Sequence, residues 1–380
     1  MTQTALSISA DFDSGNIVLL DASDPQNVQL AMRPDSKSAH FQWFHFKVDG
    51  MQPGKVHRFC LTNAGESSYN RAWTGYHAVA SYDQKTWFRV ASDFDGKALN
   101  FALSPEQPQI WFAYFEPYSR ERHDWLINKA LIETGSQLLA TGKSVEGRDI
   151  PLLRKGDGAP GKRKIWIIAQ QHPGEHMAEW FMEGVIDRAQ DNDPELQALL
   201  AKADLYLVPH MNPDGSFHGH LRTNAQGKDL NRAWQDATPE LSPEVFFVKE
   251  QMEKYGVDMF LDVHGDEEIP YVFTAACEGN PGYTEQQKAL EADFRTRLCA
   301  ITQDFQTRYG YPRSAPGRAN MNLACNSVGE RYKCLSLTLE MPFKDNDDAP
   351  NAVTGWSGQR SKTLARDVLT TLGQMVGVLR

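Results

Sequence analysis

The stretch Gln171–Gly184, which reads QHPGEHMAEWFMEG, carries two candidate metal ligands, His172 and Glu175. It follows Lys164–Gln170 (KIWIIAQ), a short apolar run rich in β-branched residues that predicts a buried strand of the parallel type. The proline and glycine between the two ligands permit a sharp turn, and the apolar residues after them recur at helical spacing. We therefore predict that a helix begins near Glu175 and that both side chains can face one ion.

Two ligands do not make a catalytic zinc site, so a third has to come from elsewhere in the chain. The run Gly256–Asp266 (GVDMFLDVHGD) offers His264 at the end of another apolar segment. Two histidines and one glutamate would leave a coordination position for water, as a catalytic zinc ion requires. On the HxxE spacing alone a purely structural interpretation competes, with His172 at a helix end and Glu175 as a first-turn carboxylate favoured by the helix dipole.

The composition is that of an ordinary globular protein, because 41% of the 380 residues are hydrophobic and 23% are charged. This length predicts two or three domains of ~100–200 residues each. The net charge of −10 disfavours nucleic acid as a partner. No apolar run reaches the ~18 residues that a membrane span needs, and the N-terminus lacks the basic region and apolar core of a secretory signal. The five cysteines form no metal-type CxxC pair, which fits free thiols, and we expect a cytoplasmic protein.

The first 117 residues predict an all-β domain. Runs of strand-forming residues alternate with turn residues, and the separators at 49–50 (Asp-Gly), 53–54 (Pro-Gly) and 95–96 (Asp-Gly) favour hairpins. The predicted strands are Ile17–Leu20, Phe41–Val48, Val56–Thr62, Tyr76–Ser81, Trp87–Arg89 and Gln109–Tyr114. Strands at this spacing predict a β-sandwich in residues 1–117, and we see no group of residues there that would do chemistry.

Residues 118–380 predict a second domain of the α/β class. Short apolar strands alternate with helices, which predicts a mixed parallel and antiparallel sheet flanked by helices. The predicted strands are 137–144, 149–154, 164–170, 204–209, 259–264 and 335–340, and the predicted helices are 124–133, 175–190, 194–202, 242–255, 284–309 and 361–377. In such sheets ligands bind at the carboxyl ends of the strands. Four residues fall at or just past such ends, which favours one shared site; they are His172, His210, His264 and Glu340.

Further motifs surround these residues. Leu207–Phe217 (LVPHMNPDGSF) holds a tight turn after a strand, Leu221–Trp234 (LRTNAQGKDLNRAW) contains DLNR, and Leu335–Phe343 (LSLTLEMPF) is a strand that ends in an acidic residue. Together with HPGE and LDVHGD, these motifs resemble the zinc metallocarboxypeptidases of the carboxypeptidase A type. The HPGE variant and the preceding β domain are most similar to the cytosolic carboxypeptidase subfamily, as a bacterial-type member. The resemblance implies a carboxypeptidase-like fold from about Asp124 onward.

The resemblance also implies a role for each matching residue at the metal. His172, Glu175 and His264 would ligate one zinc ion per chain, and Glu340 would be the general base that takes a proton from the water activated by zinc. Asp229 would hydrogen-bond a ligating histidine and fix its tautomer. Asp262, two residues before His264 on a strand, could orient a ligand or cap a loop.

The substrate would be held by a second group of residues. Asn231 and Arg232 match the pair that grips the terminal carboxylate of the substrate, a task that suits an amide and a guanidinium. Arg222 matches the arginine that polarises the scissile carbonyl and stabilises the oxyanion. The implied activity is hydrolysis of the C-terminal peptide bond of peptides or protein tails, with acidic residues, glutamate above all, as leaving groups. Arg318 or Arg331 would supply positive charge for such a residue.

The sequence departs from the secreted members of the family at two places. Gly174 stands where they have an arginine, and Pro316–Asn322 contains no tyrosine where they have a mobile one. Two other functions stay open: a zinc amidohydrolase acting on small N-acyl amino acids with the same ligands, and a non-enzymatic binder of carboxylate tails. We expect a peptide or protein tail as the partner, no nucleic acid and no membrane, and leave the oligomeric state open.

Overall fold

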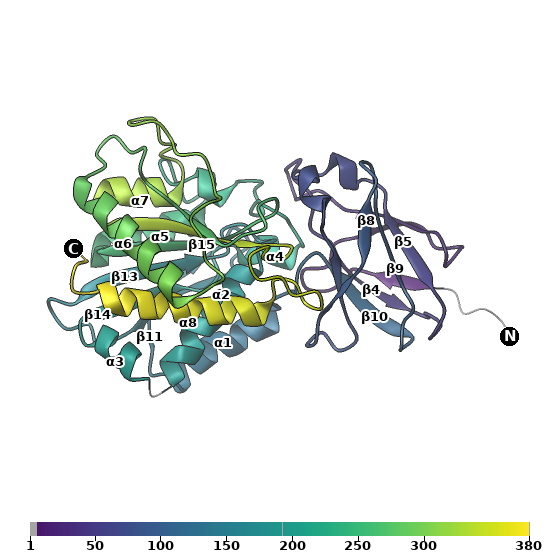
Figure 1. Ribbon diagram of the computed structural model, residues 1–380, viewed down its shortest axis with the longest axis horizontal. Helices are drawn as coiled ribbons and strands as arrows, with labels where there is room; N and C mark the ends of the chain where they lie inside the picture. The colour runs from purple at the N-terminus through teal and green to yellow at the C-terminus, as the bar shows by residue number, and fades with distance from the viewer. Residues whose placement is uncertain (1–5, 192, 380) are drawn as a thin grey trace.

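The computed structural model describes residues 6–191 and 193–379, and its all-β part lies beside a larger α/β part (Figure 1). The all-β part contains two five-stranded sheets. One has the strand order β1 (Ser7–Ser9), β4 (His45–Asp49), β10 (Gln109–Ala113), β6 (Ala78–Ser81), β7 (Phe88–Val90). The other has the order β2 (Val18–Asp21), β3 (Val28–Ala31), β5 (His57–Leu61), β9 (Leu99–Leu103), β8 (Ser92–Phe94).

Aromatic side chains from the two sheets meet in one core. Phe46 and Phe112 of the first sheet pack against Phe59 and Phe101 of the second, with ring centroids 5.0–6.3 Å apart. Such contacts stabilise a core beyond the area they bury. The predicted β-sandwich is therefore confirmed. The connection from β10 to the first helix, α1 (Arg120–Ile132), covers the predicted boundary at residue 117, whose exact position stays a prediction.

Two of the three predicted hairpins are wrong. The turn at 95–96 joins the antiparallel strands β8 and β9, as predicted. The turns at 49–50 and 53–54 instead lie between β4 and β5, which belong to different sheets. Turn residues show where the chain bends but not which strands pair. Strand pairing depends on which face of each strand is apolar and becomes buried. Two short 3-10 helices, η1 (Ala64–Glu66) and η2 (Asn70–Trp73), follow β5.

The α/β part is built on a seven-stranded mixed sheet. Its strand order is β11 (Gln137–Lys143), β12 (Asp149–Lys155), β14 (Ala203–Val208), β13 (Arg163–Ala169), β15 (Met259–Asp266), β17 (Leu335–Pro342), β16 (Phe273–Ala276). Strands β14, β13, β15 and β17 are parallel neighbours, and the outer pairs are antiparallel. The helices are α1, α2 (Met177–Gln190), α3 (Pro194–Leu200), α4 (Pro213–Phe217), η3 (Leu230–Arg232), α5 (Pro243–Tyr255), α6 (Glu285–Ile301), α7 (Ala324–Tyr332) and α8 (Gly358–Met375). This is the predicted fold class.

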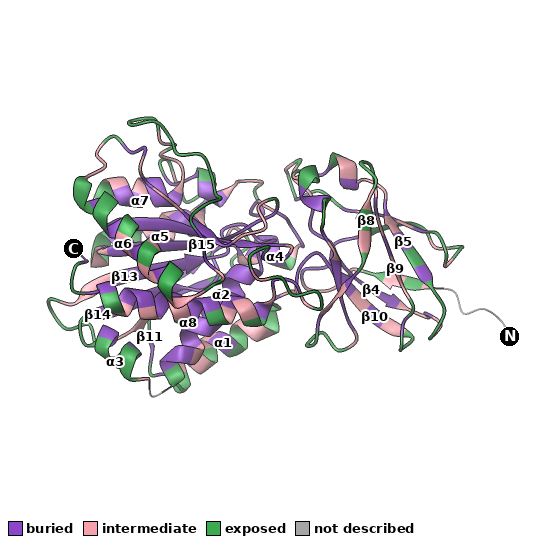
Figure 2. Ribbon diagram, in the orientation of Figure 1, coloured by how far each residue is buried: buried purple, intermediate pink, exposed green. Residues whose placement is uncertain are grey.

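Helices cover both faces of the central sheet, so its four parallel strands are almost entirely buried (Figure 2), whereas the edge strand β11 is largely exposed. Alternate residues of β13 enter different cores: Ile165 and Ile167 join residues of α2, α6 and α8, whereas Trp166 and Ile168 join residues of α5 and α7. This alternation follows from the two-residue period of a strand. Most residues of these strands are apolar, and His264 and Glu340 lie toward the carboxyl ends of β15 and β17. None of the helices in residues 6–191 and 193–379 is both long and apolar enough to cross a membrane.

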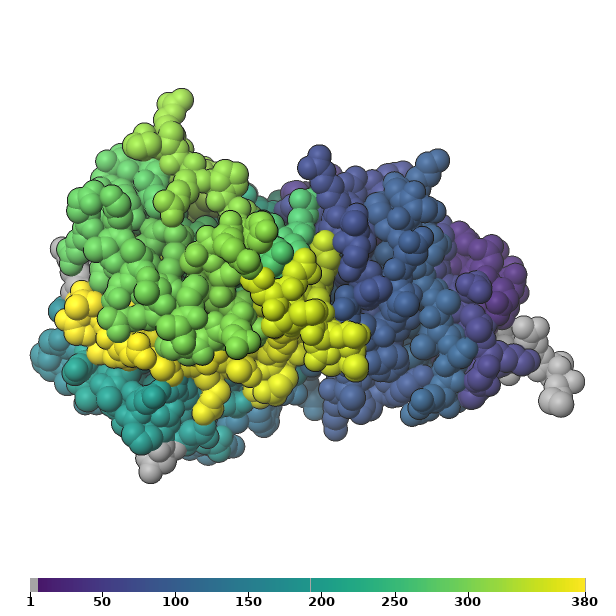
Figure 3. All heavy atoms as spheres, in the orientation of Figure 1, coloured from purple at the N-terminus to yellow at the C-terminus, as the bar shows by residue number. Residues whose placement is uncertain are grey.

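The two parts of the chain are in contact, and the late part of the chain, drawn yellow, lies against the all-β part, drawn blue (Figure 3). The late segment 344–356 reaches the all-β part, where Arg89 donates its backbone N–H to the Val353 carbonyl at 2.8 Å and Lys344 Nζ donates to the Thr74 carbonyl at 3.0 Å. On another side, Asn16 Nδ2 donates to the carbonyl of Gly219 at 2.7 Å.

The segment between α6 and β17 differs most from the prediction. Helix α6 ends at Ile301 and not at residue 309, because Thr302 is extended and Phe305 forms a parallel bridge with Val272. Strand β16, α4 and α7 were not predicted. The irregular segment 302–323 consequently lies over the C-terminal ends of the strands instead of continuing a helix.

Glu244, in the first turn of α5, predicts a pH-dependent stability. Its fully buried carboxyl has weak hydrogen bonds of 3.2–3.4 Å from Asn224 Nδ2 and the Val145 N–H, and burial raises its pKa from 4.5 to about 7. Between these pKa values the folded state holds one more proton than the unfolded state, so this group lowers stability as pH rises. Glu244→Gln keeps the neutral form at every pH.

We therefore expect the difference in unfolding free energy, variant minus wild type, to grow by roughly 2–3 kcal/mol from about pH 5 to about pH 8. Urea denaturation at both pH values measures it. Glu240→Gln, at an exposed position just before α5, is the control and should show no such change. A difference for Glu244→Gln that is independent of pH would contradict the prediction.

Candidate active site

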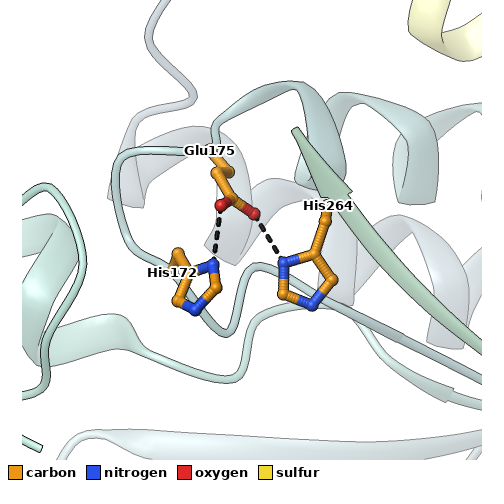
Figure 4. Close-up of side chains that lie close together, drawn as sticks. All are labelled: His172, Glu175 and His264. Atoms are coloured by element: carbon orange, nitrogen blue, oxygen red, sulfur yellow. Dashed lines mark hydrogen bonds and ion pairs between the residues drawn. The ribbon is translucent and has the colours of Figure 1, made fainter. Parts of the chain in front are cut away.

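Three side chains converge where β13 and β15 end. His172 follows β13, Glu175 precedes α2, and His264 lies on β15; all three are buried, and one ligand atom of each lies within 4.8 Å of the others. The Glu175 carboxylate lies between the two imidazoles, with Oε1 2.6 Å from His172 Nδ1 and Oε2 2.7 Å from His264 Nδ1 (Figure 4). Two imidazole nitrogens and a carboxylate oxygen are a donor set that suits zinc.

A tight turn holds His172 and Glu175 in place. Gln170 has a φ of 56°, in the left-handed region, and its Nε2 donates to the Pro173 carbonyl at 2.9 Å. The N–H of Gly174 donates to the Leu221 carbonyl at 3.0 Å, and a Cβ at Gly174 would lie 2.9 Å from that same oxygen. This close approach explains why glycine, and not arginine, stands between the two ligands.

Each imidazole uses its second nitrogen to contact a carboxylate. His172 Nε2 lies 3.0 Å from Asp229 Oδ1, and His264 Nε2 lies 2.9 Å from Asp262 Oδ2. Burial opposes ionisation of Asp229, but His172 and the Arg222 guanidinium hold its pKa well below the usual range. These contacts fix both rings with Nδ1 toward Glu175.

Glu340 lies beside this group because β15 and β17 are paired in register, with His264 opposite Glu340. Its Oε1 lies 3.0 Å from the hydroxyl of Tyr311, which is also 2.7 Å from Asp266 Oδ2. Its buried Oε2 has no hydrogen-bond partner among the residues that the structure describes. Burial raises the pKa of Glu340 well above its usual value, and the nearby carboxylate of Glu175 adds to the effect.

Tyr311 is a site residue that the sequence did not reveal. It lies in segment 302–323, just beyond the stretch that was predicted to be helical. No pattern in the sequence marks it, because the early end of α6 at Ile301 and the extended chain after it bring residue 311 back over the end of β17. The absence of a tyrosine from Pro316–Asn322 therefore does not leave the site without one.

The candidate substrate-binding residues lie on one loop but differ in exposure. Arg222 Nε donates to Asp229 Oδ2 at 2.8 Å. Asn231 is buried; its Oδ1 accepts the Ala324 N–H at 2.8 Å, and its Nδ2 lies 3.4 Å from His264 Nε2. Arg232 is exposed and bonds the Asn231 carbonyl at 2.7 Å. Arg222 and Asn231 thus adjoin the three converging side chains, whereas Arg232 lies at the surface beside them.

A cavity of about 320 Å³ opens next to Tyr311 and Thr338, two residues before Glu340 on β17. Its charged lining residues are three arginines and one glutamate; they are Arg295, Arg308, Arg313 and Glu278. Each of the three arginines pairs with a carboxylate, of Glu278, Glu291 or Asp348. Arg331 does not line this cavity, and its guanidinium pairs with Glu253 on α5. Arg318 is exposed and does not line this cavity.

His210 does not join the shared site. It is buried after β14, and its ring neighbours His123, with centroids 5.7 Å apart. Burial lowers the pKa of His210 well below its usual value. The expectation that all four strand-end residues share one site is therefore wrong for His210, because β14 ends on the side of β13 away from β15.

The contact between Asp229 and His172 predicts the strength of metal binding. Asp229→Asn removes the charge that orients the imidazole, and we expect zinc affinity to fall by about 10–100-fold. Competition with a chromogenic chelator measures the dissociation constant. Asp236→Asn, at an exposed position nearby, is the control. Equal affinities for both variants would exclude this role for Asp229.

Two family models match the chain. Residues 8–115 match the cytosolic carboxypeptidase N-terminal domain, and residues 129–350 match the zinc carboxypeptidases. A metallo-carboxypeptidase from Pseudomonas aeruginosa in complex with (2-guanidinoethylmercapto)succinic acid is 62% identical, with a TM-score of 0.97, over 98% of this chain and all of that one. A metallo-carboxypeptidase from Burkholderia cenocepacia is 43% identical, with a TM-score of 0.94, over 98% of this chain and 99% of that one.

A more distant similarity is to human cytosolic carboxypeptidase 1, at 26% identity over 322 residues. That match covers 72% of this chain but only 26% of the human protein. These similarities do not favour the alternative of an amidohydrolase for small N-acyl amino acids.

Proposed function

Because the chain belongs to the zinc carboxypeptidase family, a family of metallopeptidase hydrolases, we propose that it removes the C-terminal residue of peptides or protein tails at a site that holds one zinc ion. His172, Glu175 and His264 would hold the ion. The observation that carries this proposal is the convergence of their three ligand atoms within 4.8 Å, directly beside Glu340. When bound, zinc acts as a Lewis acid that lowers the pKa of a water molecule toward ~7.

Glu340 is the proposed general base. Tyr311 occupies its Oε1, so the unpartnered Oε2 is the oxygen that can accept a proton from the attacking water and deliver it to the leaving amine. Burial raises the pKa of Glu340 and so favours the protonated form of its carboxyl group. A cation bound beside Glu340 would lower this pKa again and favour the carboxylate. The balance suits a group that has to gain and then lose a proton.

Asn231 and Arg232 are proposed to bind the terminal carboxylate, and Arg222 to stabilise the oxyanion of the scissile carbonyl. The Ala324 N–H on Asn231 Oδ1 fixes the amide, which leaves Nδ2 as the donor on the side of His264. The exposed guanidinium of Arg232 can reorient toward a substrate because one hydrogen bond to a carbonyl is all that holds it among the described residues.

The proposed leaving residue is acidic, with glutamate preferred. The 320 Å³ cavity beside Glu340 supports this choice, because three of its lining residues are arginines, Arg295, Arg308 and Arg313. Relatives named cytosolic carboxypeptidases support a cytoplasmic location.

Glu340→Gln tests the general base. The amide cannot accept the proton, so we expect kcat to fall by about 10²–10⁴-fold while bound zinc stays at the wild-type level. Steady-state kinetics and metal analysis of the same preparation measure both quantities. Glu285→Gln, at an exposed position on α6, should behave as wild type. A variant at Glu340 that turns over normally would remove this residue from the mechanism.

Paired peptides test the exopeptidase activity. Peptides that end in glutamate, lysine or leucine are supplied as free acids and as C-terminal amides, and products are identified by mass spectrometry. We expect hydrolysis of the free acids alone, fastest for glutamate, because the amide offers no charge to Asn231 and Arg232. Arg232→Ala should raise KM for the free acids about tenfold. Equal cleavage of acids and amides would contradict the proposal.

A further inference from the structure

A carboxylate of the all-β domain holds the loop that carries Arg222. Asp35 is 3% exposed and accepts the backbone N–H groups of Leu221, Arg222 and Thr223 at 2.6, 2.9 and 2.8 Å, together with the Thr223 hydroxyl at 3.1 Å. Three consecutive N–H groups of the α/β domain thus have their acceptor in the other domain. Hydrogen bonds to an ionised carboxylate are stronger than those between neutral groups.

The side chain of Arg222 is held on two sides as well. Its Nε donates to Asp229 Oδ2 at 2.8 Å, and its Nη1 donates to the hydroxyl of Tyr69, from the all-β domain, at 2.5 Å. Its Nη2 makes no hydrogen bond to any residue in the described ranges. A guanidinium has five N–H donors in one plane, so two fixed donors set the direction of the remaining ones.

Tyr69 is itself rigidly placed. Its backbone N–H donates to Gln42 Oε1 at 2.8 Å, and Gln42 Nε2 donates back to the Tyr69 carbonyl at 3.2 Å. Gln42 is fully buried and also donates to the Tyr114 hydroxyl at 2.9 Å. Gln42, in the core of the β-sandwich, therefore fixes the backbone of the residue whose phenol contacts Arg222.

The loop is bonded on its other side to the metal ligands. The Leu221 carbonyl accepts the N–H of Gly174, between His172 and Glu175. Asp229, the partner of Arg222, contacts His172. The loop thus lies between an anchor in the all-β domain and the proposed zinc site, and Arg222 spans the two.

We infer that Tyr69 is a positioning residue for catalysis, which orients Arg222 toward the developing oxyanion through the bond between its hydroxyl and Nη1. Asp35 anchors the backbone of the loop that carries Arg222. The all-β domain is then part of the catalytic apparatus and not only a neighbouring module. This inference rests on the proposed role of Arg222 in the carboxypeptidase reaction.

Tyr69→Phe removes the hydroxyl and keeps the ring, which lies 5.7 Å from the Arg222 guanidinium carbon. An oxyanion contact exists only in the transition state, so we expect kcat to fall about tenfold with KM changed less than about twofold. The assay uses the full-length zinc enzyme and a free-acid peptide that ends in glutamate. Zinc content and the thermal unfolding midpoint are measured on the same preparations and should match the wild type.

A double-mutant cycle with Arg222→Gln distinguishes positioning from other effects. Arg222→Gln alone should lower kcat by about 10²-fold, and adding Tyr69→Phe to it should cause no further loss, because the hydroxyl acts through the guanidinium. Tyr82→Phe, which removes a hydroxyl that accepts the Glu106 N–H in the same domain, is the control and should leave kcat unchanged.

The outcomes separate this inference from the function on which it rests. An unchanged kcat for Tyr69→Phe, or an equal loss in the wild-type and Arg222→Gln backgrounds, would overturn the positioning role alone. An Arg222→Gln variant with normal kcat would overturn the proposed role of Arg222 and this inference with it. Absence of hydrolysis of every free-acid peptide by the wild-type zinc enzyme would overturn the proposed function.

Discussion

The parallel pairing of β13, β15 and β17 is the constraint on which the rest of the structure depends. Both faces of these strands are covered by helices, so most of their residues are apolar, and the candidate site residues lie at or just past their carboxyl ends. Parallel neighbours end on the same edge of the sheet, and the register places His264 opposite Glu340. The pairing of the strands alone therefore brings together His172 and Glu340, which are more than 160 positions apart in the sequence.

Local patterns in the sequence were sufficient for most of the α/β domain. Apolar runs predicted β13, β15 and β17 because buried parallel strands have a recognisable composition, and the HxxE turn between β13 and α2 predicted a pair of side chains that the structure places together. The resemblance to a known family supplied Asp229, Asn231 and Arg222, whose neighbourhood no spacing rule predicts. The order of the strands in the sheet was not predicted, which is why His210 was grouped with the wrong residues.

The features that escaped prediction depend on contacts between distant parts of the chain. Tyr311 reaches Glu340 because Phe305 pairs with Val272 and ends α6 early, a choice that helix propensity does not reveal. Residues 1–117 gave no sign of chemistry, yet Tyr69 and Asp35 contact the loop of Arg222. A tyrosine in a turn and an aspartate after a proline are common in any β domain, so only the contacts between the two domains reveal their roles.

Asp35 has one more consequence, which concerns how such proteins can change over generations. Three peptide N–H groups of the α/β domain find their acceptor in a carboxylate encoded nearly two hundred codons upstream. A recombination event that joined this hydrolase domain to an unrelated domain would leave those three N–H groups buried at the interface without an acceptor. Each unsatisfied N–H group would cost about 1–3 kcal/mol. The two domains are therefore expected to be inherited as a pair, and to drift together wherever they face each other.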